Sequence, residues 1–202
     1  MSSCIIVFVK NAELGKVKTR LAKGIGAEAA LDAYKQLTAY TKSVIDGVPL
    51  SGKQIWYSSR LEEFDIWSEG IYEKRVQHGD DLGARMNTAF KRTLEDDGYR
   101  KVVVIGSDCA DLTDSILDEA FQQLENHDVV IGPAYDGGYY LIGLSSYQPT
   151  LFEDKEWSTD HVYQDALDEI EKLKLSFYAL PTLSDVDTIE DWEKVKARLA
   201  DF

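Results

Sequence analysis

The sequence predicts one three-layer α/β/α domain over residues 1–202, with a mixed and mostly parallel sheet. Short apolar runs alternate with amphipathic helical patterns along the whole chain. The run Val102–Ile105 is wholly apolar, which is typical of a strand that helices cover on both faces. Apolar residues make up 44% of the chain, enough to bury a full core.

Six apolar runs are the expected strands. The fourth and fifth are separated by a turn containing Asp136-Gly137-Gly138, which is too short for a helical crossover. These two strands are therefore not parallel sequential neighbours, and an antiparallel strand is expected within the parallel sheet. The runs are Ile5–Val9, Gln54–Tyr57, Val102–Ile105, Val129–Ile131, Tyr139–Leu144 and Leu175–Leu180.

Most of the intervals between these runs show helical periodicity. Ala27–Ile45 is long and rich in alanine, and a last helix is expected after Asp187, where Thr188 and Asp191 have the spacing of a capping box. Three further stretches repeat the apolar stripe of an amphipathic helix. They lie within residues 82–94, 116–124 and 162–173.

The net charge of the chain argues against two classes of ligand. A net charge of −14 argues against general binding to nucleic acid or anionic membranes. Residues 1–23 nevertheless carry +4, which leaves −18 for the rest, so a local anionic ligand is expected near the N-terminus. Cys4–Val9 is too short for a membrane span, and the two cysteines lack metal-binding spacing, which favours a cytoplasmic location.

Asp108 directly follows the apolar run that ends at Ile105, after Gly106 and Ser107. Ligands of open α/β sheets bind outside the carboxyl ends of the strands. A carboxylate there is costly to desolvate without a partner, and a divalent cation is the expected one. The alternative is that Asp108 caps the following helix.

Two further segments predict contacts to an anionic ligand. In the loop after the first strand, Lys18 and Arg20 offer phosphate contacts, although the segment lacks P-loop spacing and a solvated basic loop is the alternative. At residues 79–86, Asp80 or Asp81 is expected to cap a helix whose free N–H groups bind polar ligand edges. A salt bridge to a neighbouring Asp is the alternative role of Arg85. The binding residues expected from these segments and from the strand before Asp108 are Lys10, Gly15, Lys18, Thr19, Arg20, Gly79, Asp80, Leu82, Gly83, Arg85 and Ser107.

Three more segments are candidates for substrate and metal. Asp185 and Asp187 either cap the last helix or meet Asp108 to hold Mg²⁺ or Mn²⁺ together with substrate phosphates. Residues 136–139 form either a simple tight turn or part of a substrate pocket, and residues 157–159 either a helix start or the acceptor side. The substrate-binding residues expected here are Asp136, Gly137, Gly138, Tyr139, Trp157, Ser158 and Thr159.

Together these motifs resemble the DUF2064 family of GT-A-like proteins and are similar to molybdenum-cofactor and 2-phospholactate guanylyltransferases. The resemblance implies the Rossmann-like nucleotide-diphospho-sugar transferase fold, with the nucleotide over the first loop. It also implies a metal on Asp108, with Asp187 or Asp185 as second ligand. Ala12 and Ala110 stand where the family has proline, which puts the rigidity of both loops in doubt. The segments that carry the resemblance are 10–21, 79–86, 106–112, 132–144, 157–159 and 185–192.

The expected function is a metal-dependent transfer from a nucleotide-activated donor, with an NDP-sugar glycosyltransferase favoured. Asp108, Lys18 and Arg20 are the expected catalytic residues, and Asp160 and His161 are candidates for the general base. Two alternatives stay open: a nucleotidyltransferase that releases pyrophosphate, and an inactive nucleotide-binding regulatory module.

The expected partners are a nucleotide or nucleotide-sugar donor and a small-molecule acceptor. Three aromatic residues, Trp56, Trp67 and Tyr72, are expected at the surface, where they leave room for a homodimer.

Overall fold

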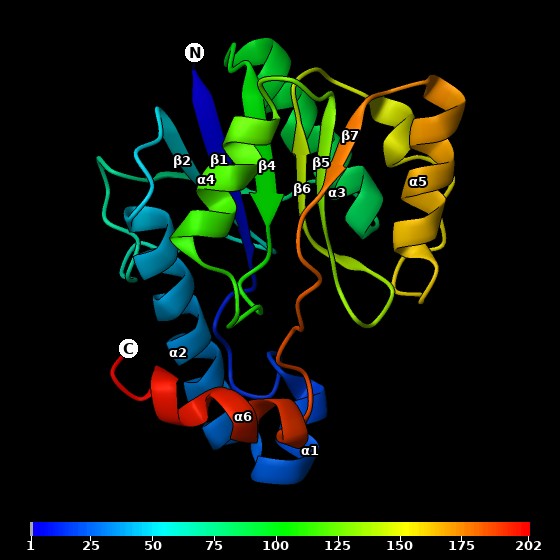
Figure 1. The fold of residues 1–202 in the computed structure, drawn as a ribbon. Coiled ribbons are helices and arrows are strands. Elements are labelled where there is room, and N and C mark those ends of the chain that lie inside the picture. Colours follow the sequence, from blue (N-terminus) through cyan, green and yellow to red (C-terminus); the bar gives the residue numbers. More distant parts are fainter. Residues whose placement is uncertain (1) are drawn as a thin grey trace.

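The computed structural model describes residues 2–202 and contains a seven-stranded sheet with helices on both faces (Figure 1). The strand order is β3-β2-β1-β4-β6-β5-β7. Strand β6 runs antiparallel to both of its neighbours, and every other pairing is parallel. The predicted mixed sheet is therefore confirmed. The strands are β1 (Ser3–Val9), β2 (Gly52–Tyr57), β3 (Glu73–Val76), β4 (Lys101–Ile105), β5 (Val129–Pro133), β6 (Tyr139–Leu144) and β7 (Phe177–Ala179).

Two helices cover each face of the sheet. Alternate residues of β1 point to opposite faces, so Ile5 packs in the core under α2 and α4 while Ile6 packs in the core under α3 and α5. Both side chains are fully buried, and burial of each stabilises the fold by about 1.5–3 kcal/mol. The helices are α1 (Thr19–Ile25), α2 (Ala27–Asp46), α3 (Leu82–Lys91), α4 (Asp114–Gln123), α5 (Val162–Leu173) and α6 (Ile189–Leu199); a π-helical turn (Arg92–Asp96) prolongs α3, and a 3₁₀ turn covers Pro149–Leu151.

Helices α1 and α6 lie beyond the sheet, at the end where β1 and β4 terminate (Figure 1). Leu21 of α1 packs against alanines of α2, and Leu199 of α6 packs against Leu37 of α2. Six of the seven strands run in one direction, so their carboxyl ends meet at this edge, where β6 begins. The loops that follow these strands are therefore brought together beside α1 and α6.

Two elements of the structure have no strong signal in the sequence. Strand β3 has the polar sequence Glu-Lys-Arg-Val and lies at the edge of the sheet, so burial imposes no apolar pattern on it. Helix α1 has only seven residues and follows directly from the basic loop, so it shows no periodic stripe. Among residues 2–202 we find no helix with the length and hydropathy of a membrane span.

The expected exposure of three aromatic residues is wrong. Trp56, Trp67 and Tyr72 are only 1%, 3% and 4% exposed. Trp56 packs in the core under α3, and Trp67 and Tyr72 meet edge to face at 5.1 Å between ring centres. These side chains complete the core, as large aromatic residues commonly do, and offer no surface to a second copy of the chain.

Candidate functional site

A cleft of about 540 Å³ opens at the carboxyl edge of the sheet. Segments far apart in the sequence line it: the loop after β1, the end of β4, the β5–β6 turn, the segment before α5 and the segment before α6. It brings together fifteen of the residues expected from the sequence, and Tyr34 and Val162 join them. The fifteen are Lys10, Lys18, Thr19, Arg20, Leu82, Asp108, Asp136, Gly138, Tyr139, Trp157, Ser158, Thr159, Asp160, Asp185 and Asp187.

Lys18 lies at the centre of the charged part of this cleft. Its backbone is left-handed (φ 47°, ψ 45°), an unusual conformation for a residue with a side chain, and it begins α1. The side chain is 3% exposed, and its Nζ lies 2.8 Å from Asp108 Oδ1 and 3.3 Å from Asp187 Oδ1. Strain in the backbone thus accompanies a buried ammonium that joins two distant carboxylates.

The charge of Lys18 is stabilised by its neighbours. Burial lowers the pKa of this ammonium, but the carboxylates of Asp108, Asp187 and Asp185 outweigh burial, and the net direction is upward. Lys18 is therefore positively charged throughout the physiological pH range.

Three carboxylates converge from the segments after β4 and before α6. The backbone N–H of Val186 donates to Asp108 O at 2.9 Å, which fastens one segment to the other. Arg20 Nη1 lies 3.6 Å from Asp187 Oδ2. Burial and the nearby charge of Asp108 raise the pKa of Asp185 to about 7, so this carboxyl group binds its proton more readily than an exposed one.

Helix capping does not account for these aspartates. Thr113 caps α4, and Thr188 caps α6 in a capping box with Asp191. The alternative roles of Asp108, Asp185 and Asp187 as caps are therefore wrong, because hydroxyl residues occupy both cap positions.

The donor set fits a divalent cation that has two protein carboxylates and completes its coordination with phosphate and water oxygens. Asp108 Oδ1 is buried, and among the described residues its polar partner is the ammonium of Lys18 at 2.8 Å. Within residues 2–202, no group of three or more His, Cys, Asp or Glu side chains is placed to hold a metal unaided. Substrate oxygens are thus required to complete such a site.

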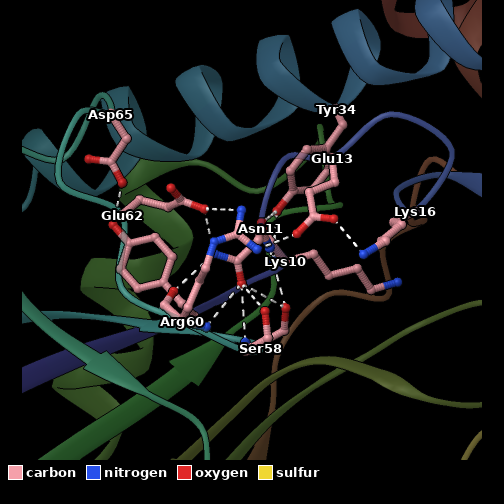
Figure 2. A network of polar contacts seen from close by, with 11 residues as sticks. Lys10, Asn11, Glu13, Lys16, Tyr34, Ser58, Arg60, Glu62 and Asp65 are labelled. Carbon is pink, nitrogen blue, oxygen red and sulfur yellow. Dashed lines mark hydrogen bonds and ion pairs between the residues drawn. The ribbon is translucent and has the colours of Figure 1, made fainter.

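Asn11 organises the outer part of the β1 loop (Figure 2). It is 5% exposed, and its Oδ1 accepts hydrogen bonds from the backbone N–H and hydroxyl of Ser59 at 3.1 and 2.8 Å. Its Nδ2 donates to Arg60 O at 2.9 Å and to Glu62 Oε1 at 2.7 Å. Arg60 in turn pairs with Glu13 of the β1 loop. One buried amide therefore ties the loop after β1 to the segment after β2.

Tyr34 of α2 fixes the start of the same loop. Its hydroxyl accepts from Lys10 N and donates to Lys10 O, both at 2.8 Å. Sequence reasoning missed both Tyr34 and Asn11. Tyr34 lies on the apolar face of a long helix and looks like core, whereas the position of Asn11 directly after a buried strand was a usable signal.

The opposite wall of the cleft depends on two glycines. A Cβ on Gly83 would lie 2.3 Å from Trp157 Nε1, so only glycine lets the indole pack on the first turn of α3. Gly137 has φ +88°, and a Cβ there would lie 2.1 Å from Asp160 O. These contacts join the β5–β6 turn, α3 and the segment before α5 into one surface.

Several residues expected in the site do not line the cleft. Asp81 caps α3 by accepting from Ala84 N at 2.8 Å, and Arg85 Nε donates to Gly79 O at 3.1 Å instead of meeting an aspartate. His161 is exposed and lies 3.3 Å from Asp160. The expected residues outside the lining are Gly15, Gly79, Asp80, Gly83, Arg85, Ser107 and Gly137.

Comparison with known proteins gives a matching family and many similar solved structures. The family described as "Uncharacterized protein conserved in bacteria (DUF2064)" matches residues 48–159. A candidate nucleotide-diphospho-sugar transferase from Desulfovibrio desulfuricans G20 is 36% identical, with a TM-score of 0.89 over 98% of this chain and 87% of the other. No curated protein matches the chain.

More distant structures share the fold. Rv0371c from Mycobacterium tuberculosis H37Rv is 12% identical, with a TM-score of 0.63 over 96% of this chain and 98% of the other. The inositol-1-phosphate CTP transferase from T. maritima is 12% identical, with a TM-score of 0.59 over 98% and 96% of the two chains. Rv0371C is also known in complex with manganese. The predicted fold and family resemblance are confirmed, and the expected transferase class agrees with the relative that is 36% identical.

Proposed function

Since the chain belongs to the DUF2064 family, we propose that it is a glycosyltransferase that uses a nucleotide-diphosphate sugar and a divalent cation. The observation that carries the proposal is the buried ammonium of Lys18 between Asp108 and Asp187, with Arg20 beside them, at the carboxyl edge of the sheet. In this arrangement the two carboxylates can bind the cation of a cation–diphosphate complex, and Lys18 and Arg20 can bind its phosphate oxygens.

The residues of the β1 loop have separate tasks in this reaction. Lys18 and Arg20 stabilise the charge that develops on the departing diphosphate, since preorganised charges in a cleft need little reorganisation during the reaction. The network around Asn11 keeps this loop in place. A divalent cation held by Asp108 and Asp187 would add Lewis-acid neutralisation of the same diphosphate.

The acceptor is expected against the wall formed by Asp136, Tyr139 and Trp157. Its hydroxyl oxygen bonds to the anomeric carbon, while the bond from that carbon to the diphosphate oxygen breaks. The diphosphate keeps the electron pair, and the hydroxyl proton is released to solvent. Tyr139 is not the base in this scheme, because burial raises the pKa of its hydroxyl, which contacts Met86 Sδ at 3.8 Å.

The proposal is tested by incubating the protein with NTPs and NDP-sugars in the presence of Mg²⁺ or Mn²⁺, followed by mass spectrometry of the products. Release of an NDP and a glycosylated product is expected. Release of pyrophosphate from an NTP would show that the protein catalyses nucleotidyl transfer instead of glycosyl transfer. Metal-enhanced nucleotide binding without turnover on any donor would favour an inactive binding module.

Two lysine variants test whether the transfer rate depends on Lys18 in particular. Lys18→Met should lower the rate by about 10²–10³-fold, the usual cost of one electrostatic contributor. The exposed Lys23 lies in the last turn of α1, so Lys23→Met is a matched control and should retain the wild-type rate.

A further inference from the structure

Building on the proposed glycosyl transfer, we propose that the acceptor is an unphosphorylated polyhydroxyl compound. The inference rests on how charge is divided between the two walls of the cleft. The cations that line it are Lys10, Lys18 and Arg20, all from the end of β1, the loop that follows it and the start of α1.

The opposite wall carries only negative ionised groups among the described residues. Asp136 and Asp160 line it together with the ring of Tyr139 and the indole of Trp157. Both carboxylates are exposed to the cleft and to solvent. A phosphate ester placed here would face like charges without a compensating cation.

Three basic side chains of the neighbouring segments do not line the cleft. Arg85 donates to Gly79 O, and Lys155 Nζ donates to Asp165 O at 3.0 Å. His161 is not among the residues that line the cleft, and its Nε2 lies 3.3 Å from Asp160 Oδ1. Among residues 2–202, no basic side chain on this wall lines the cleft to meet a phosphate on the acceptor.

The same wall suits hydroxyl groups. Ionised carboxylates only accept hydrogen bonds, and hydroxyl groups are the matching donors of an uncharged acceptor. Gly83 lets Trp157 seat against α3, which presents a fixed aromatic surface to the apolar side of a ligand. Ser158 and Thr159 add hydroxyls that both donate and accept.

The charge pattern also separates the two transfer reactions. The T. maritima protein of similar fold is an inositol-1-phosphate CTP transferase, so its substrate carries a phosphate. In nucleotidyl transfer to such a substrate, the acceptor phosphate is the nucleophile and lies beside the donor. The acidic wall of the present chain disfavours that arrangement and favours a hydroxyl nucleophile.

Matched acceptor pairs test the inference. Donor binding is first measured by calorimetry with Mn²⁺, and transfer is then compared for myo-inositol against inositol 1-phosphate, glycerol against glycerol 3-phosphate, and glucose against glucose 6-phosphate. We expect kcat/KM to favour the unphosphorylated member at least tenfold. Equal or greater transfer to the phosphorylated members would overturn the acceptor assignment.

Charge reversal on the wall provides the second test. Asp160→Lys should shift the preference toward the phosphorylated member at least tenfold, because it places a cation at the acceptor wall. Asp168→Lys makes the same change on the exposed side of α5 and should leave the preference unchanged. Equal shifts in both variants would contradict a local effect.

The outcomes for donor and acceptor are distinguishable. Absence of donor binding would overturn the proposed function itself. Donor binding without transfer to any unphosphorylated member would overturn only the acceptor assignment.

Discussion

Replacing Asp185 with asparagine should stabilise the protein at neutral and alkaline pH. Asp185 is half-buried between Asp108, Asp136 and Asp187, and its pKa rises from 3.8 to about 7. The folded state therefore holds this proton more tightly than the unfolded state. The associated stability is fully present below about pH 4 and is lost as the pH rises through 7.

The magnitude follows from the size of the pKa change. About three pKa units correspond to about 4 kcal/mol, which is a ceiling because solvent screens a half-buried charge. Without divalent cations, Asp185→Asn should be more stable than wild type at pH 8 by about 1–4 kcal/mol. The difference should shrink toward zero near pH 4, where both side chains are neutral.

Urea denaturation at several pH values measures this difference directly. Asp32→Asn, at an exposed carboxylate of α2, is the matched control and should show no comparable gain. Mg²⁺ with a nucleoside diphosphate should narrow the gap, because a bound cation favours the ionised carboxylate. A variant that is no more stable than wild type at pH 8, or a gap that does not change with pH, would refute the reasoning.

Three further variants test the scaffold of the site. Asn11→Ala should lower the free energy of unfolding in urea by about 2–3 kcal/mol, because several buried donors and acceptors lose their partner. The control Asn87→Ala removes only the hydrogen bond from Tyr147 and should lower it by about 1 kcal/mol. Equal losses in the two variants would contradict the central role of Asn11. Gly137→Ala should lower the free energy of unfolding by about 1–3 kcal/mol more than the control Gly98→Ala. Both glycines have a positive φ, but only an added Cβ at Gly137 would meet a neighbouring backbone. Equal melting temperatures for the two variants would argue against that contact. Thr188→Ala should lower the free energy of unfolding by about 1 kcal/mol, because α6 loses its N-terminal cap. It should also weaken metal–nucleotide binding measured by calorimetry, because Asp187 directly precedes this cap. Unchanged affinity would show that the position of Asp187 does not depend on the cap.

The sequence predicts the fold well because burial imposes a pattern on most elements. The wholly apolar run Val102–Ile105 of β4 and the short turn before β6 are enough to indicate a parallel sheet with one reversed strand. Strand β3 is not predictable in this way, because its polar residues lie at the sheet edge and show no apolar pattern. Helix α1 is not predictable from apolar periodicity either, because seven residues are too few to show a period.

The site is predictable as far as topology determines it. Residues that follow parallel strands meet at one edge, so Asp108 and the β1 loop were expected together. The direct pairing of Lys18 with Asp108 was not expected, since it depends on a left-handed backbone at Lys18. Tyr34 was missed because its hydroxyl has a polar role on an otherwise apolar helix face. The sequence predicts Trp67 at the surface, whereas the structure buries it against Tyr72 through a contact that local sequence does not reveal.

The central claim is that Asp108, Asp187 and Lys18 form one site for a cation and a diphosphate together. Titration of Mn²⁺ into the protein, followed by electron paramagnetic resonance with and without a nucleoside diphosphate, tests it most directly. The account predicts that the diphosphate tightens Mn²⁺ binding at least fivefold, that Mn²⁺ tightens diphosphate binding by the same factor, and that Asp108→Asn abolishes both effects. Mn²⁺ and diphosphate binding that are independent of each other, or coupling that survives Asp108→Asn, would contradict it.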